Sequence, residues 1–102
     1  MSTTEIPDFV GDLERAVVAL RGMAYEHRLH ILVLLLAGER TPAELNDHIP
    51  AEATAIAHHL RFLRDAKLIK RHRRGRQSLY TLYSDETRSL IAEVLRYARS
   101  GH

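Results

Sequence analysis

Two short helices in close succession are predicted within residues 41–64, which read TPAELNDHIPAEATAIAHHLRFLR. The opening threonine can cap a helix, the proline suits the first helical position, and the glutamate that follows completes a capping box. Pro50 ends this helix, because proline cannot continue the backbone hydrogen-bond ladder. A second helix is expected from about residue 52 to 66, with its apolar side chains on one face. Two helices this close together predict a helix-turn-helix.

The pattern downstream changes to that of a β-hairpin. Residues 68–72 and 77–83 are expected to be strands on either side of the sequence Arg-Arg-Gly-Arg. Gly75 supplies the positive φ that a tight turn requires. A hairpin that follows a helix-turn-helix predicts a winged helix-turn-helix.

Helices are also expected before and after this unit, at about residues 8–22, 26–36 and 85–99. The helix at 26–36 is apolar nearly all round in its second half and should be the buried centre. The fold class is therefore mainly α with a small β-hairpin, in one domain over residues 1–102. Each terminal helix carries an apolar stripe that a core of this size cannot hide, which predicts a two-fold dimer through the terminal helices. The expected interface residues are Phe9, Leu13, Val17, Leu20, Leu90, Ile91, Val94 and Leu95.

The basic residues are concentrated in the middle of the chain, although the whole chain carries a formal net charge of only +2. Residues 1–50 hold eight acids and four bases, a net charge of −4. Residues 51–83 hold eight bases and two acids, a net charge of +6, and residues 84–102 hold three of each. Such clustering is typical of a surface that binds a polyanion.

Several functional classes are excluded or disfavoured. The chain has no cysteine, so disulfides, thiolate metal sites and thiol chemistry are absent. The longest apolar run, residues 31–37, falls well short of the ~20 residues that span a bilayer. The acidic N-terminus lacks the features of a signal peptide, so a cytoplasmic location is expected. No nucleophile is placed with a base and an orienting group, so an enzyme is not expected.

Double-stranded DNA is the polyanion that this arrangement favours. The second helix of a helix-turn-helix enters the major groove, and the wing reaches the backbone or the minor groove. Three arginines around Gly75 are more than a turn needs, and guanidinium groups suit phosphate. The predicted DNA-contact residues are Thr54, Ala57, His58 and Arg61 on the helix, and Arg73, Arg74, Arg76 and Gln77 on the wing.

These segments resemble the ArsR/SmtB transcriptional regulators. The resemblance covers roughly residues 13–98 and rests on RLHIL at 28–32, TAIAHHLRFLR at 54–64, KLI at 67–69, RRGR at 73–76 and YTL at 80–82. It implies a homodimeric protein that binds an operator, usually as a repressor that an inducer releases. The family commonly has a serine where this chain has Ala57, which implies a different operator sequence. It also commonly has a Cys-x-Cys metal site near residue 41, where this chain has none.

Few residues of the sequence indicate which effector the protein would bind. Without cysteine, a metal such as nickel or zinc would need histidine and carboxylate ligands. His30 shares a helix face with His27 at i, i+3 and with Glu26 at i, i+4, so the three could hold one ion, and His102 is a further candidate. Because two or three ligands without a fourth make a weak site, surface and capping roles are the favoured interpretation of these residues.

Two alternatives remain open at this stage. One is a winged helix that binds another protein through its apolar terminal helices. The other is a regulator that needs no effector and works with a partner protein. A stable homodimer in the absence of any partner would favour the DNA-binding regulator.

Overall fold

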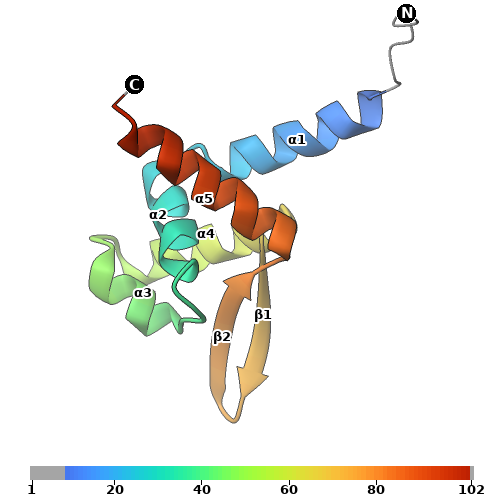
Figure 1. Cartoon of the computed structure of the whole chain (residues 1–102). Coiled ribbons are helices and arrows are strands. Elements are labelled where there is room, and N and C mark those ends of the chain that lie inside the picture. Colours follow the sequence, from blue (N-terminus) through green and yellow to red (C-terminus); the bar gives the residue numbers. More distant parts are fainter. Residues whose placement is uncertain (1–8, 102) are drawn as a thin grey trace, which may run out of the picture.

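The computed structural model describes residues 9–101, which form five helices and one hairpin (Figure 1). The winged helix-turn-helix predicted from the sequence is confirmed, and the boundaries move by no more than two residues. The predicted start of the first helix at residue 8 lies outside the described residues. In chain order the elements are α1 (Val10–Met23), α2 (Glu26–Leu35), α3 (Pro42–His48), α4 (Ala53–Asp65), β1 (Ile69–Arg74), β2 (Gln77–Leu82) and α5 (Asp85–Arg99).

The core is built around α2, as its apolar sequence predicts. Ile31, Leu32 and Leu35 are almost completely buried, and α2 contacts α1, α4, α5 and β2. Leu45 and Ile49 at the end of α3, the inner face of α4, and the residues at the base of the wing complete the same core. One apolar cluster therefore holds both the helix-turn-helix and the wing in place.

Local capping sets where α3 and α5 begin. The Thr41 hydroxyl accepts a hydrogen bond from the Glu44 backbone N–H at 3.2 Å, and the Glu44 carboxylate accepts one from the Thr41 N–H at 2.9 Å. This is the capping box predicted from the sequence. At α5, the Ser84 hydroxyl accepts from the Thr87 N–H at 3.1 Å. Both starts depend on residues within one turn of each other, which is why the sequence shows them.

The hairpin is longer than predicted on its first strand. β1 runs antiparallel to β2 up to the pair Arg74 and Gln77, so the turn contains only Gly75 and Arg76. Gly75 has φ +63°, as the first position of a two-residue hairpin turn with glycine requires. On the far side of β2, Arg40 exchanges two backbone hydrogen bonds with Tyr80, at 2.9 and 3.1 Å. The loop between α2 and α3 is thereby tied to the wing.

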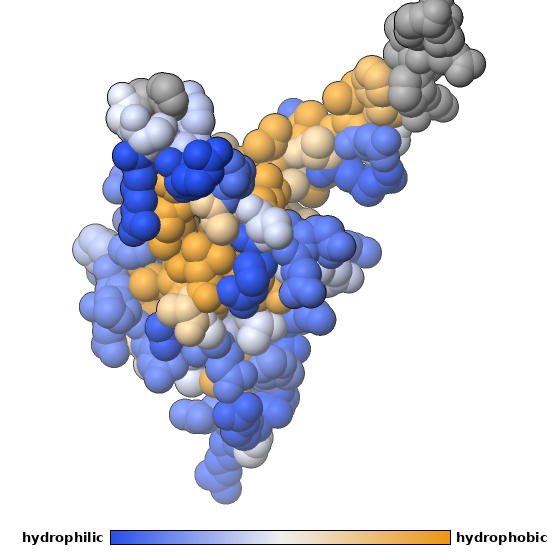
Figure 2. Space-filling view, viewed as in Figure 1, coloured by the Kyte–Doolittle hydropathy of each residue, from blue (hydrophilic) through white to orange (hydrophobic). Residues whose placement is uncertain are grey.

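The terminal helices differ in how firmly they join the core. α1 extends away from the rest of the molecule (Figure 1), and Figure 2 shows apolar residues along its length. Leu13 and Leu20 are more than half exposed. Within residues 9–101 no helix is both long and apolar enough to cross a membrane.

The structure corrects one predicted interface residue on α5. Ile91 is completely buried in the protomer's own core, because its side of α5 packs on α2 and β2. It therefore contributes to folding and is not available at the surface for a second protomer. Leu90 stays exposed, whereas Val94 and Leu95 are half-buried.

Candidate nucleic-acid interface

Helix α4 turns a polar face to solvent and an apolar face to the core. Ile56, Leu60 and Leu63 are buried. On the opposite side, four exposed residues line one shallow hollow, and all four are predicted DNA-contact residues: Thr54, Ala57, His58 and Arg61. The small Ala57 leaves room for a close approach, while the neighbouring histidine and arginine supply hydrogen-bond donors.

The turn between α3 and α4 is fixed by a side chain. The Asn46 amide donates to the backbone carbonyls of Ile49 at 3.3 Å and of Ala51 at 2.8 Å. These bonds satisfy carbonyls of a turn in which Pro50 has no N–H to donate. The angle at which α4 leaves α3 is therefore set by a local polar contact in addition to the shared core.

The wing presents arginines on two different faces. Side chains alternate along a strand, so Arg71 and Arg73 share one face of β1, and His72 and Arg74 share the other. Arg73, Arg74, Arg76 and Gln77 are all exposed near the turn, as expected for groups that reach DNA. They are not equivalent, because Arg74 Nη2 lies 2.9 Å from the Glu39 carboxylate.

A second hollow lies between α4 and the wing, and it contains two basic residues that are not among the predicted DNA-contact residues. Arg64 and Arg71 line it together with Arg61, and its remaining walls are Pro42, Ala57, Leu60 and Tyr80. Two sequence signals could have indicated these residues. Arg64 follows Arg61 by three positions on one helix, and Arg71 alternates with Arg73 on one strand.

Aromatic and basic side chains meet where α1 ends and α2 begins. The His59 ring on α4 lies 5.1 Å from the Tyr25 ring and 6.0 Å from the His27 ring, measured between centroids. The Arg28 guanidinium lies 4.2 Å over the Phe62 ring. Burial lowers the pKa of His59 below the ordinary histidine value, and the positive charge of Arg28 lowers it further, with smaller contributions from the other nearby histidines. The neutral form of His59 is therefore favoured in the folded protein.

The predicted metal ligands do not form a metal site in one chain. Over the described residues 9–101, no group of three or more histidine, aspartate or glutamate side chains is gathered closely enough to hold an ion. Glu26, His27 and His30 lie on the first turns of α2, where His27 makes ring contacts with Tyr25 and His59. His102 lies outside the described residues. The donors present in the described part of one chain therefore do not fit a bound metal.

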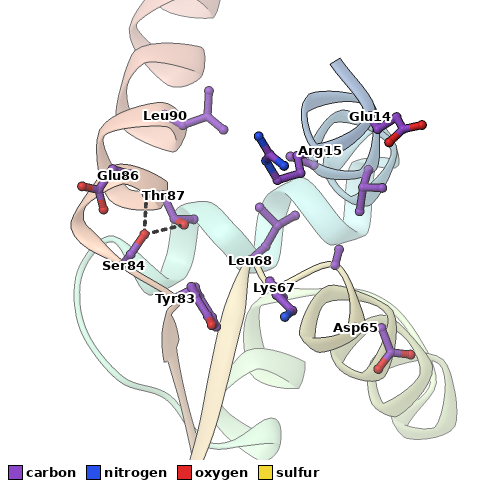
Figure 3. A pocket seen from close by; sticks show the side chains of 13 residues that line it. Glu14, Arg15, Asp65, Lys67, Leu68, Tyr83, Ser84, Glu86, Thr87 and Leu90 are labelled. Carbon is purple, nitrogen blue, oxygen red and sulfur yellow. Dashed lines mark hydrogen bonds between the residues drawn. The ribbon is translucent and has the colours of Figure 1, made fainter. Parts of the chain in front are cut away.

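A cavity lies between α1, the turn after α4 and the start of α5. Its volume is about 670 Å³. Figure 3 shows Leu90 on α5 and Arg15 on α1 facing each other across this space, with Leu68 at its floor. Of the exposed large apolar residues of α1, Val18 lines this cavity.

Comparison with known sequences gives a consistent set of relatives. The model of the family described as bacterial regulatory protein, arsR family, matches residues 26–71. The transcriptional activator HlyU of Vibrio cholerae is 36% identical over 77 residues, which are 76% of this chain and 71% of HlyU. The transcriptional regulator NmtR of Mycobacterium tuberculosis is 32% identical over 83 residues, covering 81% and 69%. The transcriptional repressor SdpR of Bacillus subtilis is 31% identical over 74 residues, covering 72% and 82%.

Solved structures agree with these relatives. HlyU from Vibrio cholerae superposes with a TM-score of 0.82 at 33% identity, covering 86% of this chain and 96% of that one. A homodimeric winged helix-turn-helix DNA-binding domain from Mycobacterium bovis superposes with a TM-score of 0.83, covering 97% and 91%. At 24% identity, the second likeness shows the fold alone.

Proposed function

The chain belongs to the ArsR family of DNA-binding transcriptional regulators, and we propose that it acts as a homodimeric repressor on a palindromic operator. The family consists of regulators and not of enzymes. In this proposal residues 1–102 work as one winged helix-turn-helix domain, in the cytoplasm where bacterial DNA lies. The observation that carries the proposal is the division of the molecule into a basic end and an unpartnered apolar side.

The basic end supports binding in the major groove with additional contacts to the backbone. Thr54, Ala57, His58 and Arg61 share the exposed face of α4, so one helix can offer all four to base edges and phosphates. Arg73 and Arg76 extend from the wing beside it, where guanidinium groups suit phosphate or the narrow minor groove. Arg64 and Arg71 join the proposed contacts, because they line the hollow between the helix and the wing.

The apolar side supports assembly of two copies of this chain. α1 carries Leu13, Val17 and Leu20 exposed, and exposed Leu90 of α5 lines the cavity together with exposed Val18 of α1. An exposed helix stripe of this kind destabilises a free monomer in water, and burial removes that cost. To bind one face of DNA, such a dimer must present its two copies of α4 about one DNA turn, ~34 Å, apart.

Repression is the sign of regulation that we propose, since a dimer bound across promoter DNA blocks access to it. The relatives' names include both an activator and a repressor. Fusing the chain's operator to a reporter gene and deleting the protein tests the sign directly. Reporter output that rises on deletion supports repression, and output that falls indicates activation.

A metal effector, nickel or zinc, requires ligands from outside the described part of one protomer. Such ligands would come from side chains outside residues 9–101, among them His102, or from a second protomer, because the described histidines and acids of one chain form no group of three. Isothermal titration with each metal, followed by operator binding with and without metal, tests this hypothesis. Metal binding that leaves operator affinity unchanged would exclude a sensing role.

The main test uses the wing arginines. A variant with Arg73, Arg74 and Arg76 all changed to Gln should bind a duplex selected from a random pool about 10 to 100-fold more weakly at ~0.15 M salt, with a shallower salt dependence. Unchanged affinity would contradict the wing's proposed role.

Sedimentation of the wild-type protein alone tests the dimer. A monomer that associates only with another protein would favour the interaction module instead.

A further inference from the structure

One acidic side chain reaches into the basic end of the molecule from outside the basic segment. Glu39 lies in the loop between α2 and α3, next to Arg40, whose backbone is hydrogen-bonded to Tyr80 on β2. These two backbone bonds hold the loop against the wing. The position of Glu39 relative to the wing is therefore fixed by the fold.

The two oxygens of the Glu39 carboxylate take one partner each on β1. Oε2 lies 2.9 Å from Arg74 Nη2, and Oε1 lies 3.2 Å from His72 Nε2. His72 and Arg74 are two positions apart, so they project from the same face of the strand. The carboxylate is the least exposed member of the group, at 33% against 46% for His72 and 70% for Arg74. The Glu39 carboxylate therefore offsets the positive charge of Arg74 on one face of the wing. Arg71 and Arg73 lie on the other face of the strand.

We infer that Glu39 limits the sequence-independent affinity of the DNA interface, acting as a positioning residue through Arg74. Attraction between basic side chains and phosphates is nearly independent of sequence and supplies most of the non-specific affinity. If Arg74 left Glu39 to bind a DNA phosphate, the Glu39 carboxylate would remain unpaired beside a polyanion. The pair thus lowers the affinity for DNA of any sequence. It leaves the base-facing residues of α4 untouched, so operator and random-sequence affinities fall by the same factor and their ratio is set by α4.

This inference rests on the proposed DNA binding and is tested with Glu39→Gln. Glutamine keeps the size of the side chain and an accepting oxygen but removes the charge. The matched control is Glu93→Gln on α5, which removes the same charge from another exposed glutamate–arginine pair, with Arg96 Nε at 2.8 Å. Both proteins and the wild type are titrated with a selected operator duplex and with a random-sequence duplex, from about 50 to about 200 mM salt.

Glu39→Gln should bind the random duplex about 3 to 10-fold more tightly, and the slope of log affinity against log salt should steepen by about 0.9 per protomer. The operator duplex should gain the same factor, so the ratio of operator to random affinity should stay constant. Glu93→Gln should leave the affinities and the slope at the wild-type values. An unchanged slope and random-duplex affinity in Glu39→Gln would overturn the inference. An equal loss of both affinities would also overturn it, because a merely structural role gives that result.

A second variant tests whether the effect passes through Arg74. Adding Arg74→Gln to Glu39→Gln should return the slope and the random-duplex affinity to wild-type values. A double variant that keeps the steep slope would refute the assigned route. If wild-type protein binds neither duplex, both the proposed function and this inference fail. If the wild type binds both duplexes and Glu39→Gln behaves like it, only the inference fails.

Discussion

Helices α1 and α5 are both amphipathic and both lie at an end of the fold, yet the protomer holds them differently. α5 inserts Ile91 into the core and keeps Val94 partly buried against it. Of α1, only Gly22 and Met23 at its last turn are buried, and the large apolar side chains before them are exposed. α5 is therefore part of the protomer's own fold. α1 is joined to it at one end and leaves its apolar stripe for another surface.

The joint at the end of α1 is specific. The Arg28 side chain donates to the backbone carbonyls of Gly22 at 2.6 Å and Arg21 at 2.9 Å, so a residue of α2 satisfies carbonyls that the end of a helix leaves free. Gly22 itself lies so close to the turn after α4 that an added Cβ would come within 2.7 Å of Leu68 Cδ1. The direction of α1 is thus set by the contacts of its last turn.

Removing the buried contact of α5 should produce the largest effect. Ile91→Ala should lower the free energy of unfolding by about 2 to 5 kcal/mol, because a completely buried side chain is deleted and a cavity is left. Ser89→Ala, two positions away and exposed, is the control. Urea unfolding at one fixed protein concentration compares them. If both variants lost the same free energy of unfolding, the two sides of α5 would not differ in their contribution to the core.

Placing charge on α1 should affect assembly and spare the fold. The double variant Leu13→Glu with Val17→Glu should weaken the proposed dimer about 100-fold, which is about 2.7 kcal/mol. The reason is that two apolar side chains would bring unpaired carboxylates into the interface. Sedimentation equilibrium measures the dimer, and far-UV circular dichroism checks that the protomer stays helical. A dimer of unchanged strength would show that α1 is not at the interface.

Filling the space beside Gly22 should weaken the joint between α1 and the core. Gly22→Val should lower the free energy of unfolding by about 1 to 3 kcal/mol, because the added methyl groups collide with Leu68 and Ala66. Gly11→Ala, at the outer end of the same helix, meets only the flexible Arg15 side chain. It should be neutral or stabilise the helix by up to ~1 kcal/mol. Thermal unfolding should give a lower midpoint for Gly22→Val than for Gly11→Ala, because the buried residues of α1 lie in its last turn.

Acid should loosen this joint slightly, and this is the smallest expected effect. His59 contacts Tyr25 there, and burial followed by the charge of Arg28 lowers the pKa of His59. The unfolded chain therefore binds a proton on His59 at a higher pH than the folded chain does. The stability contributed by neutral His59 is complete above about pH 6.5 and is lost as the pH falls towards the folded pKa. His59→Asn should lose less stability than wild type between about pH 7.5 and pH 5.5. If the urea midpoints of the two proteins fell equally between these pH values, the prediction would be wrong.

Much of the fold could be read from local signals in the sequence. The capping box at Thr41 and Glu44, the serine that caps α5 and the glycine in the wing turn each act within a few residues. The predicted DNA-contact residues on α4 do share one exposed face, because helical spacing alone places them together. Contact of these residues with DNA stays a prediction.

Other features depended on residues far apart in the chain. The sequence shows one apolar stripe on this helix, formed by Leu90, Ile91, Val94 and Leu95. The stripe is wide enough to pack against the protomer's own core and against a second surface. Only the packing of α5 on α2 shows that Ile91 belongs to the core. In the same way, only the fold shows that Arg64 and Arg71 lie in one hollow, because the wing folds back beside α4.

By itself the sequence determined the type and limits of each element, the basic middle segment and the absence of thiol chemistry, because these follow from composition and from interactions within a few residues. The tertiary structure decided which apolar residues are core and which are surface, and which cations are already paired. Glu39 reaches His72 across 33 residues of chain and Arg74 beside it, and no local pattern encodes such a contact. Burial and ion pairing over that separation depend on how the elements pack, and so they become visible only in the folded chain.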